Sequence, residues 1–171
     1  GICHRRGALQ EQLMQKTKKL NTRNIYFLVK TLESLRKIPD FPLTVVEAPM
    51  GYGKTTAVRE YLKNTDLKSS WAWIHDSSVT VFWKCFCRNF YEIDPEKAEN
   101  LEALGFPEDS VSRQVMLNLI GGMDFPCDMV FVMDDYHTAA SPEINRFIEF
   151  LVRSGIPNFH LVLIVRYINL D

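Results

Sequence analysis

The sequence predicts an α/β fold of three layers, in which helices flank a mainly parallel sheet. Four short apolar runs have the length and β-branched content of buried strands, and they lie at residues 43–48, 71–76, 129–135 and 160–166. Each run is apolar on both faces, which is typical of a parallel sheet covered by helices on both sides. Helical patterns separate the runs, and this alternation completes the prediction.

Length and composition fit one folded domain. The chain has 171 residues, of which 46% are hydrophobic and 24% charged, so a disordered or fibrous protein is excluded. No apolar run reaches the roughly 18 residues that cross a membrane. The first residues also lack the apolar core of a secretory signal. We therefore expect a cytoplasmic protein that makes no membrane contact.

Cysteine, histidine and charge give no separate functional pattern. The cysteines at 3, 85, 87 and 127 lack the paired spacing of a zinc site, and the histidines are scattered singly. We expect free thiols, buried in the apolar stretch around 85 and 87. Residues 1–40 hold nine Lys/Arg against three Asp/Glu. Because these cations are dispersed among few aromatics, a solvated helix face is favoured over a nucleic-acid site.

The N-terminal part is predicted to be helical. Residues 8–20 and 24–37 carry apolar side chains at helical spacing, and Pro39 and Pro42 end the second helix. We divide the chain into an N-terminal helical segment at 1–40 and a core at 41–171. The chain stops five residues after Arg166, just beyond a core strand, so we expect a fragment of a longer protein.

Five more helices are predicted within the core. One runs from Lys54 to about Asn64, and another from the second strand to about Phe90. Residues 94–122 form two helices, the second capped by Asp109 or Ser110. The last helix has the clearest boundaries: Ser141 suits its N-cap, Pro142 its first turn and Gly155 its C-terminal cap.

The stretch APMGYGKTT, directly after the first strand, predicts a phosphate-binding loop. The pattern G-x-x-x-x-G-K-[ST] ends at Gly53, Lys54 and Thr55, although Ala48 occupies its first position. Backbone amides in this loop can surround a polyphosphate where they meet the positive end of a helix. The candidate nucleotide-binding residues are Pro49, Met50, Gly51, Tyr52, Gly53, Lys54, Thr55 and Thr56.

Each polar residue of this loop has an expected role. Lys54 can reach the β and γ oxygens of a triphosphate, Thr55 can bind Mg²⁺, and Thr56 can bind the α-phosphate. The alternative is a plain glycine turn with a solvated Lys54. The strand before the loop and the helix after it favour the phosphate-binding interpretation.

The run MVFVMDD adds two carboxylates at the end of a parallel strand, the edge where ligands bind in open α/β sheets. We expect Asp134 to hold Mg²⁺ through its water shell and Asp135 to orient or deprotonate an attacking water, with a surface acid pair as the alternative. Arg166, at the end of the last strand, is a candidate sensor of the γ-phosphate, or an ordinary strand-end residue.

The segments APMGYGKTTAV, MDDYH, PEINRFIEFL and LVLIVR resemble the ATPase domain of MalT-like regulators of the LuxR family. These belong to the STAND class of P-loop NTPases, whose core is ASCE/AAA-like. The resemblance covers about residues 25–171, and WAWIHD also looks like a segment of that family. It implies an ATP- or ADP-binding switch with Mg²⁺, which self-associates in the ATP-bound form and hydrolyses ATP slowly. DNA binding would need a C-terminal helix-turn-helix that these residues do not contain.

Two other classes of function stay open. A P-loop kinase or nucleic-acid motor would need an acceptor pocket or a motor motif, and the sequence shows neither. A scaffold could bind nucleotide without hydrolysing it. The residue that discriminates is Asp135, because many ATPases of this class use the longer glutamate as catalytic base. We therefore expect weak hydrolysis, far below the roughly 10 s⁻¹ median of enzymes.

Overall fold

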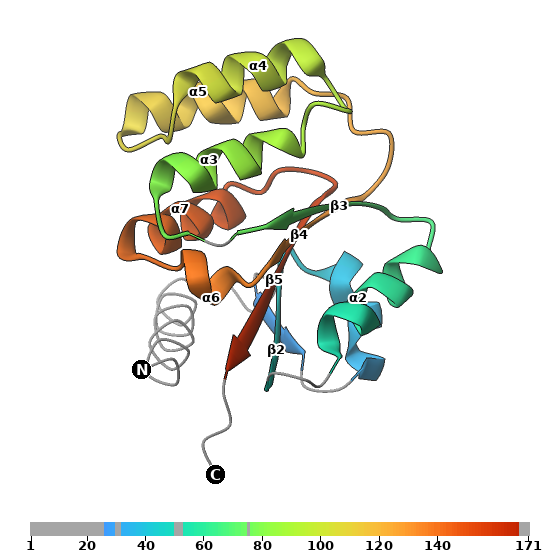
Figure 1. Cartoon of the computed structure of the whole chain (residues 1–171). Coiled ribbons are helices and arrows are strands. Elements are labelled where there is room, and N and C mark those ends of the chain that lie inside the picture. The colour runs from blue at the N-terminus through green and yellow to red at the C-terminus, as the bar shows by residue number, and fades with distance from the viewer. Residues whose placement is uncertain (1–25, 30–31, 50–52, 75, 168–171) are drawn as a thin grey trace.

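The computed structural model describes residues 26–29, 32–49, 53–74 and 76–167, and it contains a five-stranded parallel sheet (Figure 1). The strand order is β1-β2-β5-β4-β3, and every neighbouring pair is parallel. This confirms the predicted α/β class and parallel sheet. The strands are β1 (Tyr26–Val29), β2 (Leu43–Pro49), β3 (Lys68–Trp73), β4 (Met129–Asp134) and β5 (Phe159–Tyr167).

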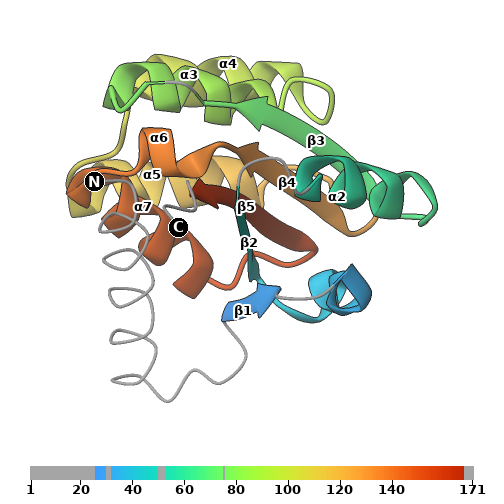
Figure 2. The same cartoon turned by 60° about the horizontal axis from the view of Figure 1, so that its bottom comes forward.

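Helices connect the strands along the chain, as parallel pairing requires. In chain order they are the 3₁₀ helix η1 (Leu32–Asp40), then α2 (Lys54–Lys63), α3 (Val79–Arg88), α4 (Pro95–Leu104), α5 (Ser110–Gly121), α6 (Tyr136–Ala139) and α7 (Pro142–Arg153). Figure 1 shows α4 and α5 stacked beyond α3, farther from the sheet. Figure 2 shows η1 and α2 together on the side of the sheet away from α7.

Alternate residues of the central strands separate two hydrophobic clusters, one on each face of the sheet. On β4, Phe131 and Met133 enter the cluster with α3 and α7, while Val130 and Val132 enter the cluster with η1 and α2. The strand β4 is buried along its whole length, as the apolar run predicted. We call these the α3/α7 face and the α2 face.

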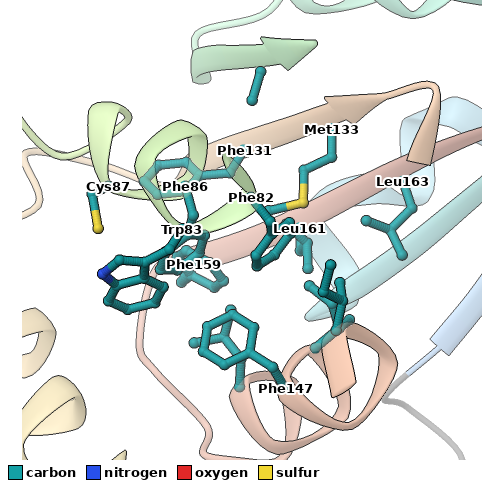
Figure 3. Packing of buried hydrophobic residues seen from close by; sticks show 14 of the residues in the cluster. Phe82, Trp83, Phe86, Cys87, Phe131, Met133, Phe147, Phe159, Leu161 and Leu163 are labelled. Atoms are coloured by element: carbon teal, nitrogen blue, oxygen red, sulfur yellow. The ribbon is translucent and has the colours of Figure 1, made fainter. Parts of the chain in front are cut away.

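The α3/α7 face is built around aromatic rings (Figure 3). Phe147 of α7 meets Phe82 and Phe86 of α3 edge to face, with ring centroids 5.7 and 5.3 Å apart. Phe131 of β4 similarly contacts Phe159 of β5 at 4.9 Å. Such edge-to-face pairs add about 0.5–1.5 kcal/mol each beyond the burial of their area. The helices are thereby held to the sheet by interlocking rings.

Three of the predicted helix ends are confirmed. Ser141 caps α7 by accepting a hydrogen bond from the Ile144 amide at 3.2 Å. Asp109 caps α5 in the same way, with 2.7 Å to the Ser112 amide. Gly155 follows α7 with φ +65°, a left-handed conformation that favours glycine after a helix.

The helix predicted over residues 24–37 is wrong, because Tyr26–Val29 form β1 and pair with β2 from Leu43 to Val46. An apolar run of four residues is compatible with one face of a helix or with a strand. Here the pairing with β2 determines that it is a strand. The helix that follows is a 3₁₀ helix and runs past Pro39 to Asp40. Residues 8–20 lie outside the described residues, and the division of the chain at residue 40 stays a prediction.

The second strand also differs from its prediction at 71–76, because β3 spans Lys68–Trp73. It is an edge strand that pairs with β4 alone, so it tolerates the exposed Lys68 and Ser69 at its start. The prediction relied on apolar residues and therefore placed the strand too late. This shift puts Trp73 at the end of the strand.

Of the cysteines, Cys85, Cys87 and Cys127 are free thiols. Cys87 is buried as predicted, and burial raises the pKa of its thiol, whereas Cys85 and Cys127 are half-buried. Cys3 lies outside the described residues. None of the helices in the described ranges is long and apolar enough to cross a membrane.

Candidate functional site

The carboxyl ends of β2, β5 and β4 bring the predicted site residues to one edge of the sheet. The strand β5 lies between the other two, and its Arg166 is in register with Ala48 at the end of β2. On its other side, Leu163 is in register with Met133, next to the two acids. The glycine loop and the acids thus come from strands separated by a single strand.

Helix α2 begins directly at the end of the glycine loop. Gly53 has φ +66° and ψ +23°, a left-handed conformation in which a side chain would be strained. Its carbonyl accepts the first helical hydrogen bond, from the Ala57 amide at 3.0 Å. The helix N-terminus, with the positive end of its dipole, therefore starts where the sequence motif predicts an anion. Met50, Gly51 and Tyr52 lie outside the described residues.

Thr55 and Asp134 meet at this edge, although 79 residues separate them in the chain. Thr55 Oγ1 donates a hydrogen bond to Asp134 Oδ1, with 3.4 Å between the oxygens. The carboxylate is only 8% exposed, so it needs such donors to offset its loss of water. A second donor is the Asp135 amide, 2.8 Å from the same oxygen.

This pair of oxygens suits a hard divalent cation. Mg²⁺ binds oxygen at about 2.0–2.1 Å in octahedral geometry, so two adjacent ligands lie about 2.9 Å apart. The observed 3.4 Å between Thr55 Oγ1 and Asp134 Oδ1 is within a small adjustment of that spacing. The two residues predicted to hold the metal are therefore close enough to contact one ion.

Asp135 occupies a distinctive backbone position. Its φ of 53° and ψ of 37° are left-handed, which aspartate adopts more readily than most residues because its short side chain bonds locally. Its carboxylate accepts a hydrogen bond from Trp73, with 2.6 Å between Nε1 and Oδ2. The last residue of β3 thus contacts the residue after β4.

The turn after Asp135 is anchored to α7. Tyr136 is fully buried, and its hydroxyl donates a hydrogen bond to Asn145 Oδ1 at 2.6 Å. Burial raises the pKa of this phenol far above its usual value, so it stays a neutral donor. The tyrosine of MDDYH therefore fixes the acidic turn to the hydrophobic core.

An open cleft of about 420 Å³ adjoins the acids, and it is lined by Arg59, Trp71, Ala72, Trp73, Asp134 and Asp135. The guanidinium of Arg59, on α2, lies over the Trp71 ring at 4.7 Å from its centroid. This cation–π contact joins α2 to β3 across the cleft. The cleft is thus bounded by α2 and by the carboxyl ends of β3 and β4.

The remaining candidates fall around this edge. Lys54 is the first residue of α2 and is half-buried, while Thr56 in the same turn is exposed. Pro49 ends β2 in register with Tyr167, and the Arg166 backbone lies beside the loop strand. The side chains of Pro49 and Arg166 lie outside the described part of the structure. Their predicted roles stay predictions.

The sequence did not single out Trp73 or Arg59 as part of this region. The tryptophan was part of a predicted strand, but the end of that strand was placed three residues late. With the correct end, the rule that ligands bind at the carboxyl edge of parallel strands would have pointed to Trp73.

Asp76, the acid that ends the segment WAWIHD, lies just before α3. It accepts a hydrogen bond from the Ser78 amide at 2.8 Å.

The fold and this edge define an α/β chain whose glycine loop and acidic strand converge on one site. No protein-family model matches the chain. The chain is similar to the HTH-type transcriptional regulator MalT of Vibrio parahaemolyticus, with 26% identity over 144 residues. The alignment covers 80% of this chain but spans only 16% of the length of that regulator.

Proposed function

We propose that this chain is a regulatory nucleotide-binding region that binds ATP or ADP with Mg²⁺. The observation that carries the proposal is the 3.4 Å contact between Thr55, at the start of α2, and Asp134, at the end of β4. P-loop NTPases hold Mg²⁺ with a Ser/Thr of the loop and an Asp of a neighbouring strand. The strand β5 between β2 and β4 supports the finer ASCE-type assignment.

Within the proposed site, the residues of the chain have separate roles. Amides of the loop and of the first turn of α2 bind the phosphates, and the Lys54 ammonium binds the β and γ oxygens. Thr55 and Asp134 hold the metal, which supplies neutralisation of phosphate charge. Arg166 comes from the strand next to the loop strand and contacts the γ-phosphate.

Hydrolysis, in this proposal, is slow. A water oxygen attacks the γ-phosphorus, and the bond from that phosphorus to the β–γ bridging oxygen breaks, giving ADP and inorganic phosphate. The proton of the water passes to the Asp135 carboxylate, which also orients the water. A scaffold that holds ATP without cleaving it would release no phosphate, and a kinase would transfer the phosphate to an added acceptor.

The regulatory part of the proposal comes from the similarity to MalT, which is a transcriptional regulator by name. We propose that the ATP-bound form self-associates and the ADP-bound form does not. DNA binding is assigned to a helix-turn-helix outside these residues. Sedimentation velocity with Mg-ATP, with Mg-ADP and without nucleotide tests this directly, since only Mg-ATP should increase the sedimentation coefficient.

The nucleotide site itself is tested by binding of a fluorescent ATP analogue with and without Mg²⁺. Asp134→Ala should remove the gain in affinity that Mg²⁺ gives to the wild type. Asp66→Ala is the matched control, because Asp66 is an exposed acid beyond the C-terminal end of α2. Equal Mg²⁺ dependence in the wild type and in Asp134→Ala would refute the metal site.

A further inference from the structure

Trp73 is placed unusually for a tryptophan. Its side chain is 63% exposed, whereas Trp83, in the α3/α7 face, is 2% exposed. Burial of the ring therefore contributes little to stability here. The hydrogen bond that the indole donates to Asp135 is the contact that accounts for its position. Trp73 ends β3 in register with Asp134, and its indole contacts Asp135.

The contact between Trp73 and Asp135 is a hydrogen bond from a neutral donor to a carboxylate. The indole Nε1 donates to Asp135 Oδ2 over 2.6 Å, a short contact in which the acceptor carries a negative charge. The indole N–H can only donate and the ionised carboxylate can only accept, so the direction of this hydrogen bond is determined.

Asp135 is thus held at two points. Its main chain is fixed in the left-handed conformation, with the amide donating to Asp134 Oδ1 at 2.8 Å. Its side chain is fixed by the indole of Trp73. Both restraints come from residues that line the same cleft.

We propose that Trp73 is a positioning residue for Asp135, which holds the carboxylate where it orients the attacking water. This inference rests on the proposed nucleotide hydrolysis and assigns it a further residue. A carboxylate that can rotate between several rotamers spends only part of its time in the productive one, so a restraint raises the rate of the chemical step. It should leave nucleotide affinity unchanged, because the indole N–H acts on the Asp135 carboxylate, whose role is in the chemical step.

The test uses Trp73→Phe, which keeps the aromatic ring and removes the indole N–H. Single-turnover hydrolysis of Mg-ATP should slow about tenfold, the equivalent of roughly 1.4 kcal/mol in the barrier. The dissociation constant of Mg-ATP, measured by calorimetry, should stay within about twofold of the wild type. Trp83→Phe is the matched control, since it also removes an indole N–H, which Trp83 donates to the Leu101 carbonyl away from the cleft, and it should leave hydrolysis unchanged.

A double-mutant cycle separates positioning from a general effect on the fold. In the Asp135→Asn background, Trp73→Phe should change the remaining rate of hydrolysis by less than about twofold, because this background has no carboxylate for Trp73 to orient. Trp73→His supplies a second variant, whose imidazole N–H should restore part of the rate. Thermal melting should be almost unchanged in both Trp73 variants, because the Trp73 side chain is 63% exposed.

Each other outcome overturns the inference. Trp73→Phe that hydrolyses ATP as fast as the wild type, or faster, shows that the indole does not position Asp135. An equal slowing in the Asp135→Asn background shows that it acts elsewhere, and a matching loss of affinity makes it a nucleotide contact. A wild type that binds Mg-ATP without hydrolysing it also overturns this inference but leaves the nucleotide site intact. A wild type that binds no nucleotide refutes the proposed function itself.

Discussion

The two faces of the sheet are built from different side chains. The α3/α7 face contains large rings, among them Phe82, Phe86 and Phe147, and two further helices, α4 and α5, are stacked beyond α3. The α2 face is a thin layer of aliphatic side chains, with Val58 and Leu62 of α2 covering Val132 and its neighbours. One face of the sheet is therefore covered by a thick, aromatic core and the other by a thin, aliphatic one.

The difference separates stability from binding. The α2 face is covered by the helix that begins at the glycine loop, so any movement of α2 on the sheet also moves Lys54 and Thr55. The α3/α7 face reaches the site through Ala72, which lines the cleft, and through the turn at Asp135 and Tyr136. We therefore expect changes on the α3/α7 face to alter stability alone, and changes on the α2 face to alter stability and nucleotide affinity together.

The largest effect is expected from Phe147→Ala, which leaves a cavity between α7 and α3. The loss in the free energy of unfolding should be about 3–5 kcal/mol, measured by urea denaturation. Phe147→Leu retains most of the volume and should cost much less, without altering nucleotide affinity. A loss below about 1 kcal/mol for Phe147→Ala would show that the aromatic cluster does not hold this face together.

Val58→Ala should have the next largest effect on stability and distinguishes the two faces directly. It removes two buried methyl-sized groups, so the loss should be about 2 kcal/mol. Because Val58 holds α2 to the sheet, Mg-ATP affinity should also fall, by about two- to fivefold. Val115→Ala is the control, since Val115 is 40% exposed on α5. If Val58→Ala is less stable but binds Mg-ATP as tightly as the wild type, the packing of α2 on the sheet does not affect binding at the glycine loop.

Ser141→Ala should cost about 1 kcal/mol in the free energy of unfolding, because the Ile144 amide loses its capping partner. Ser141→Asn retains a side-chain acceptor and should stay close to the wild type. Since α7 belongs to the α3/α7 face, nucleotide affinity should not change in either variant. A parallel loss of stability in both would mean that the hydroxyl does something other than cap the helix.

The smallest effect is a pH dependence of the outer helices. Hydrogen bonds from Ser112 lower the pKa of Asp109, and those from Lys97 lower the pKa of Asp94, below their usual 3.8. Carboxylates whose folded-state pKa is lowered stabilise the protein above the unfolded pKa and lose this contribution as pH falls through the folded pKa. Stability should therefore decline below about pH 4, and Asp109→Asn should weaken that decline. A pH-independent unfolding midpoint between pH 5 and 2 would contradict this.

Much of the sheet and of the site could be predicted from the sequence, because local chemistry determines it. Buried parallel strands are apolar on both faces, as in β4, and the tight turn from a strand into a helix favours glycine, as at Gly53 with its φ of +66°. The cap at Ser141 is equally local. Each of these features depends on residues a few positions apart.

The features that were missed depend on contacts between distant residues. The short strand β1 is apolar enough for either a helix or a strand, and its pairing with β2 decides between them. The hydrogen bond from Trp73 to Asp135 joins residues 62 positions apart, and it follows from the adjacency of β3 and β4. Strand order is a property of the folded sheet, so the periodicity of one segment does not predict it.

The central claim is that the glycine loop at the start of α2 binds a magnesium nucleotide. The most direct measurement is calorimetric titration of Mg-ATP into the wild type, Lys54→Ala and Lys63→Ala, with Mg-GTP as the specificity control. Lys63 is the matched cation at the other end of the same helix, in an exposed pair with Glu60. The wild type and Lys63→Ala should bind Mg-ATP with micromolar affinity, and Lys54→Ala should bind it about 100-fold more weakly. Equal affinity in all three proteins, or loss in Lys63→Ala as great as in Lys54→Ala, would contradict the account.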